Sequence, residues 1–122
     1  MRRLEIQNLT HPLSEPLLAA YCDTFLNRLK GLMFRKQLSP HEGILLVENG
    51  ESRINSAIHM FFMKFDIAVI WVNTEFAVVD VKLARKWRPY YSPAAPARFI
   101  IETRSEYLPF YQIGDQLAFH YV

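Results

Sequence analysis

The sequence predicts a mainly β, single-domain protein, an antiparallel β-sandwich or flattened barrel with one or two short helices. Residues 67–72 are apolar at every position, which is typical of a central strand covered on both faces. Apolar and polar residues alternate along residues 79–83, as in a strand with one buried face. Most gaps between predicted strands are too short for helical crossovers, so antiparallel pairing should dominate. A sandwich or a barrel covers both faces of such a sheet.

Composition narrows the class of protein. A chain of 122 residues with 51% hydrophobic and 21% charged residues suits one globular domain, expected to span residues 1–122. The formal net charge of +2 is too small to indicate nucleic acid or membrane by itself. The single cysteine, Cys22, excludes an internal disulfide and favours a reducing compartment. No signal-like or membrane-spanning apolar stretch is found, so we expect a cytoplasmic protein that does not enter a membrane.

The first half of the chain contains two short strands, a helix and a third strand. Strands are expected over residues 4–9 and 17–22, and the first is stopped by Pro12. A helix is expected over about residues 24–33, because Asp23 and Thr24 can cap its amino end. Its apolar stripe has helical spacing and consists of Phe25, Leu26, Leu29, Leu32 and Met33. Residues 43–47 follow as a buried strand and residues 48–56 as a polar loop.

The second half is expected to consist mostly of strands. After an apolar run at residues 58–63 comes the central strand, residues 65–72. Residues 73–75 form a hairpin turn into a returning strand at residues 76–83. A proline-marked loop then leads to a strand at residues 98–103 and a helical turn within residues 105–112. The last strand begins after Gly114 and Asp115, which favour turn geometry.

Four ordered blocks together resemble a known family, the domain of unknown function 192 (DUF192). They are residues 28–35 (RLKGLMFR), 42–47 (EGILLV), 58–67 (IHMFFMKFDI), and the last pair, 99–102 (FIIE) with 113–115 (IGD). The chain departs from the family pattern at Phe65, where proline is frequent. The resemblance implies a compact, mostly β fold. It implies nothing about chemistry, because no activity is established for the family.

Charged residues at the ends of apolar strands indicate a candidate ligand pocket. They are Arg35, His59, Lys64, Asp66 and Glu102. No phosphate-binding glycine loop or other catalytic motif accompanies them. We therefore favour a non-catalytic binding or accessory module for a small molecule, with no cofactor.

An enzyme is the alternative for the same residues. His59 and Asp66 could form the acid–base pair of a small hydrolase or lyase, since a carboxylate can orient an imidazole. The simpler interpretation is that Asp66 makes an ion pair or a strand-end contact, because an unpaired carboxylate beside an apolar strand is costly.

Metal binding is not expected. His59, Met60 and Met63 are ligand types that suit a soft metal, but a regular strand would point them to opposite faces. Methionines beside phenylalanines are more often core residues. No group of cysteines and histidines has zinc-site spacing.

A basic and aromatic segment suggests a second partner. It comprises Lys82, Arg85, Lys86, Trp87 and Arg88, followed by Tyr90 and Tyr91. Cations for phosphates and rings for bases are typical of single-stranded nucleic-acid binding. The same segment could instead be a solvated hairpin end that covers the core, or an aromatic contact around Trp87 in a homodimer.

Overall fold

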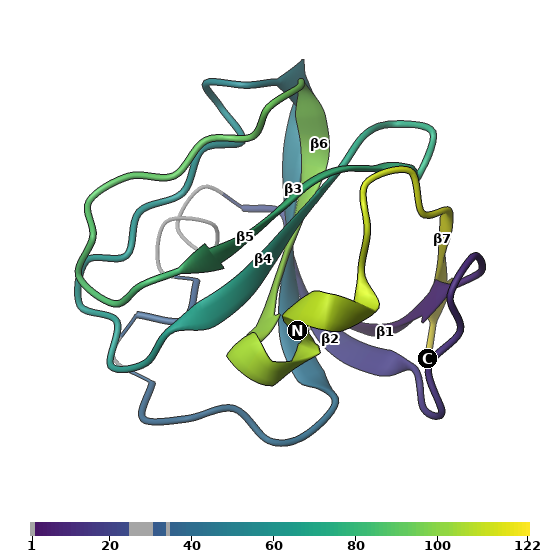
Figure 1. Ribbon diagram of the computed structural model, residues 1–122, viewed down its shortest axis with the longest axis horizontal. Coiled ribbons are helices and arrows are strands. Elements are labelled where there is room, and N and C mark those ends of the chain that lie inside the picture. Colours follow the sequence, from purple (N-terminus) through teal and green to yellow (C-terminus); the bar gives the residue numbers. More distant parts are fainter. Residues whose placement is uncertain (1, 25–30, 34) are drawn as a thin grey trace.

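The computed structural model describes residues 2–24, 31–33 and 35–122. Seven strands in this part of the chain form one sheet in the order β5-β4-β6-β3-β2-β1-β7 (Figure 1). The strands are β1 (Arg3–Asn8), β2 (Leu17–Cys22), β3 (Glu42–Ser52), β4 (Ile67–Val72), β5 (Val78–Ala84), β6 (Ala97–Arg104) and β7 (Leu117–Tyr121). A short 3-10 helix, η1 (Ser105–Phe110), follows β6. The prediction of a mainly β domain is confirmed.

The sheet is open and mixed. Neighbouring strands pair antiparallel except β2 and β3, which run parallel. That parallel pair is possible because the connection over residues 23–41 is long enough for a crossover. The sheet also curls, so that the start of β5 meets the segment before β7. The Val78 N–H donates to the Asp115 carbonyl at 2.9 Å, and the Gly114 N–H donates to the Val78 carbonyl at 2.8 Å.

Strand β4 is covered on both faces, as its apolar run predicts. All six of its residues have 0% exposed surface. Ile67, Val69 and Trp71 belong to one hydrophobic cluster, while the alternating residues belong to another. The sheet therefore separates two cores, which we call the inner core and the outer core.

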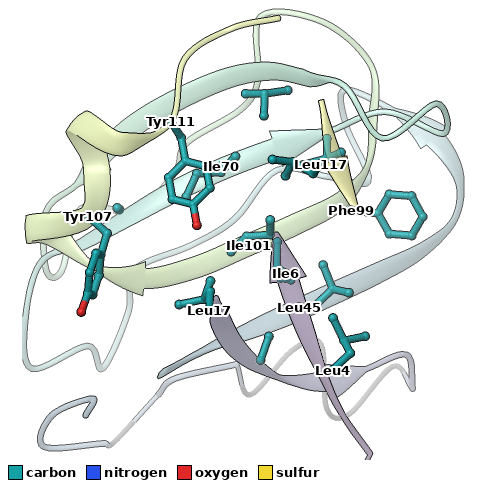
Figure 2. Close-up of a cluster of buried hydrophobic side chains, with 14 of the residues drawn as sticks. Leu4, Ile6, Leu17, Leu45, Ile70, Phe99, Ile101, Tyr107, Tyr111 and Leu117 are labelled. Carbon is teal, nitrogen blue, oxygen red and sulfur yellow. The ribbon is translucent and has the colours of Figure 1, made fainter. Parts of the chain in front are cut away.

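The inner core lies inside the curl of the sheet and receives side chains from every strand (Figure 2). Its buried members are Leu4, Ile6, Leu17, Ala19, Leu45, Val47, Ala68, Ile70, Val72, Val78, Phe99, Ile101, Tyr107, Tyr111 and Leu117. Tyr107 and Tyr111, from η1 and the residue after it, cover one end. The Tyr107 hydroxyl accepts a hydrogen bond from the His41 N–H at 2.9 Å.

The outer core lies on the opposite face and is covered largely by connecting segments. Its buried members are Cys22, Leu32, Leu38, Ile44, Leu46, Ile58, Met60, Met63, Ile67, Val69, Trp71, Ala84, Ala97 and Ile100. The Trp71 indole N–H donates to the Ser56 carbonyl at 2.7 Å, which ties one of these segments to the sheet. Irregular segments fill space less uniformly than a packed strand layer does, so a cavity is easier to form here.

Several element boundaries differ from the predictions. Residues 48–52, expected as loop, continue β3, because Ser52 still pairs with Ala97 across a register shift. Residues 58–63, an apolar run, are mostly irregular: Ile58 forms an isolated bridge with Tyr91, and residues 61–62 form a turn in which the Met63 N–H donates to the Met60 carbonyl at 3.3 Å. Residues 76–77 precede β5. The helix predicted over residues 24–33 lies mostly outside the described residues.

Two predicted turns are confirmed. The side-chain oxygen of Asn73 accepts the N–H groups of Glu75 and Ala77, each at 3.0 Å, and so forms the hairpin turn between β4 and β5. The helical turn expected after residue 105 is η1. In the ranges that the structure describes, no helix has the length and apolar character needed to span a membrane.

Candidate functional site

Glu102 is a carboxylate in the middle of the sheet. Its side chain follows the parity of Ile100 on β6 and therefore faces the outer core. Its cross-strand partners are Ile44 on β3 and Val69 on β4, both buried and apolar. Glu102 is only 5% exposed. The sequence suggested a residue at a strand end, but β6 continues to Arg104 and the strands on either side cover it.

The Glu102 carboxylate has no hydrogen-bond or ion-pair partner among the described residues, and burial raises its pKa to about 7. Every fully enclosed polar side-chain atom in the same part of the chain does have a hydrogen-bond partner. The Glu102 oxygens must therefore reach the surface of a cavity. An unpaired buried carboxyl is costly, and such groups are concentrated at functional sites.

The cavity beside Glu102 has a volume of about 430 Å³. Its lining comes from the segment at residues 31–33, the end of β3, the segment at residues 55–63, and β6. The polar side chains of this lining are Glu48, Asn49, Asn55, His59 and Glu102, and its larger apolar ones are Leu32, Met33, Leu46, Ile58, Met63 and Ile100. A mostly apolar wall with a few polar groups is typical of a small-molecule site.

His59 lines the same cavity as Glu102 and is half-buried. Its Nδ1 accepts a hydrogen bond from the Phe61 N–H at 3.3 Å, and its ring lies 5.8 Å from the Phe61 ring. Of the five residues proposed from sequence as a ligand pocket, the structure brings these two together.

The other three predicted pocket residues lie elsewhere. Arg35 donates to a Glu42 carboxylate oxygen at 3.1 Å and lines a separate hollow of about 710 Å³. An Asp66 oxygen accepts the Lys86 N–H at 2.8 Å, which is a strand-end contact rather than a hydrogen bond to His59. Lys64 lines a third hollow together with Lys86 and Trp87. The residues that the sequence grouped into one cluster therefore lie at three separate locations: the Glu102 cavity, the hollow at Arg35, and the region of Lys64, Asp66 and Lys86.

The predicted basic segment is exposed from residue 85 to residue 88, and Lys82 and Arg88 each lie near an aromatic ring. Lys82 donates from Nζ to the Ser92 carbonyl at 2.5 Å and lies 5.7 Å from the centre of the Trp71 ring. Arg88 lies over the Tyr91 ring at 5.8 Å. Arg85, Lys86 and Trp87 have exposed side chains.

A second buried carboxylate, Asp115, was interpreted from sequence only as part of a turn. It is 2% exposed and accepts hydrogen bonds from the Asn8 amide at 2.8 Å, the Gln112 N–H at 3.0 Å and the His11 ring at 2.8 Å. Burial opposes its ionisation, but these hydrogen bonds prevail and lower its pKa. Its partners are more than a hundred positions away for Asn8 and His11, so no local pattern in the sequence signals them.

Metal and thiol chemistry find little support in this geometry. No group of three or more histidine, cysteine, aspartate or glutamate side chains within the described ranges could hold a metal ion. Met60 and Met63 are buried in the outer core. Cys22 is buried, and burial, followed by the charges of Glu102 and Asp23, raises the pKa of its thiol.

The fold and the cavity together define a small, curled, mainly β domain with one unpaired carboxyl facing a space of ligand size. The chain belongs to the DUF192 family, described as uncharacterized ACR, whose model matches residues 8–119. The family resemblance noted in the sequence is thereby confirmed, and the family's function is uncharacterised.

The relatives of this chain are named UPF0127 proteins, a name that states no function. It is similar to the UPF0127 protein TK1120 of Thermococcus kodakarensis, with 48% identity over 80 residues, covering 66% of this chain and 49% of that protein. The UPF0127 protein PH1112 of Pyrococcus horikoshii is 45% identical over 80 residues, covering 66% of each. The match to the first of these spans about half of the relative's length.

Two solved structures share the fold. A candidate transcription regulator (R01717) from Sinorhizobium meliloti 1021 superposes with a TM-score of 0.82 and 15% identity, covering 97% of this chain and 92% of that one. A protein of unknown function from Novosphingobium aromaticivorans gives a TM-score of 0.76 and 18% identity, covering 95% and 83%. At these identities the likeness concerns the fold alone.

Proposed function

We propose that this domain binds a small organic molecule in the Glu102 cavity. The ligand has an apolar body and one hydrogen-bond-donating group, an alcohol or an amine, that meets the Glu102 carboxyl. The observation that supports this most strongly is the unpaired, 5% exposed carboxyl at the wall of a cavity of about 430 Å³. Ligand pockets in proteins generally range over roughly 300–1,000 Å³.

The lining favours a donor over an acceptor. The polar side chains around the cavity include two glutamates and no lysine or arginine within the described part of the chain. A ligand carboxylate would therefore meet like charge when Glu102 is ionised, and would find no lysine or arginine among the described lining residues when it is not. An ammonium or a hydroxyl would supply the hydrogen bond that Glu102 lacks.

A matched set of probes tests this proposal. Benzylamine, benzyl alcohol and benzoate share one shape and differ in the group that would face Glu102. Fragments with so few atoms commonly bind weakly, so binding should be followed by amide shifts in two-dimensional NMR spectra. We expect benzylamine or benzyl alcohol to shift the amides of cavity residues such as Ile58 and Ile100, and benzoate to leave them unchanged.

The matched variants are Glu102→Gln and Glu102→Leu. Glutamine keeps the shape and an acceptor oxygen, so alcohol binding should persist while amine binding weakens. Leucine removes the acceptor and should abolish both. The proposal fails if neither donor probe shifts the cavity amides, or if Glu102→Leu responds as the wild type does.

Acid–base catalysis in the same cavity is the second candidate function. It is favoured by the Glu102 pKa of about 7, which suits proton transfer at neutral pH, and by His59 on the same wall. Hydrolysis of p-nitrophenyl esters is a direct screen. A rate with an inflection near pH 7 that Glu102→Gln removes would support catalysis, whereas an equal rate in that variant would exclude Glu102 from it.

A further inference from the structure

A second surface, outside the Glu102 cavity, is formed by Phe62 and Trp87. These side chains are 45% and 55% exposed, and their ring centres lie 5.2 Å apart in an edge-on arrangement. Both residues have left-handed backbones, with φ of 61° for Phe62 and 68° for Trp87. This conformation is unusual for bulky side chains. The fold therefore holds two aromatic rings outward at two strained positions.

The backbone around Met60 fixes both rings. The Met60 carbonyl accepts the Trp87 N–H at 2.9 Å and the Met63 N–H at 3.3 Å, while the Met60 N–H donates to the Arg88 carbonyl at 3.2 Å. The Asp66 carboxylate adds the contact to the Lys86 N–H at 2.8 Å. Since Met60 is fully buried, the two turns that carry Phe62 and Trp87 are joined to each other and to the core. The surface is preorganised.

Positive charge surrounds the aromatic pair. Phe62, Met63, Lys64, Lys86 and Trp87 line a hollow of about 500 Å³. The side chains of both lysines are exposed, and no acidic residue in the described ranges contributes to this lining. Lys64 comes from one turn and Lys86 from the other, so the tertiary fold assembles this surface from two separate segments.

The geometry points to a binding site for single-stranded nucleic acid at this surface, a role independent of the proposed function of the Glu102 cavity. The Trp87 and Phe62 rings would stack on bases, and Lys64 and Lys86 would meet the flanking phosphates. A nucleic-acid base is favoured over a lipid headgroup, because a base offers a flat ring on which Trp87 and Phe62 can stack while its phosphates meet the lysines. The two lysines also argue against a second copy of this chain, which would bring like charges together.

Binding of a fluorescein-labelled oligothymidylate to the whole chain, followed by fluorescence anisotropy at low salt, tests the inference. The informative variant is Trp87→Gly. Glycine adopts the φ of 68° without strain and removes only a half-exposed ring, so the melting temperature should not fall. We expect its affinity for the oligonucleotide to fall by about 5- to 150-fold, the usual loss for one stacked base.

Charge variants supply the matched control. Lys64→Ala should lower the slope of log affinity against log salt by about 0.7, the value for one phosphate contact on a single strand. Lys36→Ala removes an equally exposed lysine outside the hollow and should leave that slope unchanged. Absence of binding at low salt overturns the inference, as does equal binding by Trp87→Gly. Binding only to vesicles that contain phosphatidylserine, or a dimer that Trp87→Gly dissociates, would assign the surface to another partner and also overturn it.

Discussion

Two buried carboxylates on different sides of this sheet differ in how they are satisfied. Asp115, at the seam that closes the inner core, accepts hydrogen bonds from Asn8, His11 and the Gln112 backbone, and its pKa is lowered. Glu102, on the outer face, has no such partner in the described part of the chain, and burial raises its pKa to about 7. Burial alone therefore does not mark a functional carboxyl. Glu102 is distinguished by three features together: burial, an acceptor without a hydrogen-bond donor among the described residues, and an adjoining cavity.

The surroundings of the two groups explain the difference. The inner core is enclosed by strands and by η1, and Asp115, at the seam that closes it, joins segments from both ends of the chain. The outer core is covered by connecting segments that leave a space of about 430 Å³ beside Glu102. The inner side is filled by packed side chains, while the outer side leaves a buried carboxyl at the wall of a cavity.

The largest expected effect comes from truncating neighbouring core residues. Ile100 and Ile101 are adjacent on β6, are both buried, and face the outer and inner cores respectively. Ile101→Ala should lower the free energy of unfolding by about 3–5 kcal/mol, because it opens a void in a filled core. Ile100→Ala should cost less, about 2–3 kcal/mol, because Ile100 already borders a cavity. Urea denaturation of both variants measures this, and equal losses would contradict the contrast.

The second largest effect should be the pH dependence that Glu102 gives to the free energy of unfolding. Between its ordinary pKa of 4.5 and its native pKa of about 7, the folded state holds a proton that the unfolded state has released. The contribution of Glu102 to the free energy of unfolding is therefore largest below about pH 4.5. It falls by about 3 kcal/mol as the pH rises to about 7, and is constant at higher pH.

Glu102→Gln isolates this contribution. The difference in unfolding free energy between wild type and Glu102→Gln should move in favour of the variant by that amount between about pH 4.5 and about pH 8. Urea titrations of the two proteins at several pH values measure it. A pH-independent difference would mean that Glu102 is ionised in the folded protein with an ordinary pKa.

Two glycines in β3 test how closely the sheet is packed. A Cβ on Gly43 would lie 2.7 Å from the Glu102 backbone carbonyl oxygen and 3.4 Å from Leu17, a member of the inner core. Gly43→Ala should therefore destabilise the protein by about 1–3 kcal/mol. Gly50→Ala is the control, since a Cβ there meets nothing within 4 Å, and it should be neutral or stabilising. Thermal unfolding compares them, and a neutral Gly43→Ala would show that the strands can move apart.

The smallest effect should appear at the Asp115 seam. Because its pKa is lowered, Asp115 contributes stability above its ordinary pKa of 3.8 that is lost as pH falls through the lower, native value. Asp115→Ala should cost about 1–2 kcal/mol at neutral pH through its lost hydrogen bonds. The deficit should shrink below about pH 4. Chemical denaturation at neutral and acid pH distinguishes this from a deficit that stays constant, which would exclude the charge.

The fold was more predictable from the sequence than the site. The apolar run of β4 indicates a doubly covered strand because strand parity is a local property. The extension of β3 through Ser52 was missed because polar residues form it and its pairing with Ala97 is distant in sequence. The parallel pairing of β2 with β3 likewise depends on contacts that no local pattern encodes.

The sequence predicted one group of candidate site residues, and the structure brings only two of them together. His59 and Glu102 do share a cavity, whereas Lys64 lies beside Trp87 because the turn at Met60 hydrogen-bonds to the chain near Arg88. Asp66 was proposed as a site residue because it precedes the apolar strand β4, but it makes an ordinary hydrogen bond at the strand end. Glu102 lies within the apolar strand β6, and burial raises its pKa. Glu102 was among the candidates from the sequence, and its parity with Ile100 places it on the outer face of the sheet.

The ionisation of Glu102 is the most direct test of the functional account. Titration of the Glu102 side-chain carboxyl carbon by NMR, assigned by its loss in Glu102→Gln, measures its pKa in the folded protein. An apparent pKa near 7 that shifts when benzylamine or benzyl alcohol is added is the predicted result. An apparent pKa near 4.5, unaffected by either probe, would show a solvated carboxylate and contradict the proposed site.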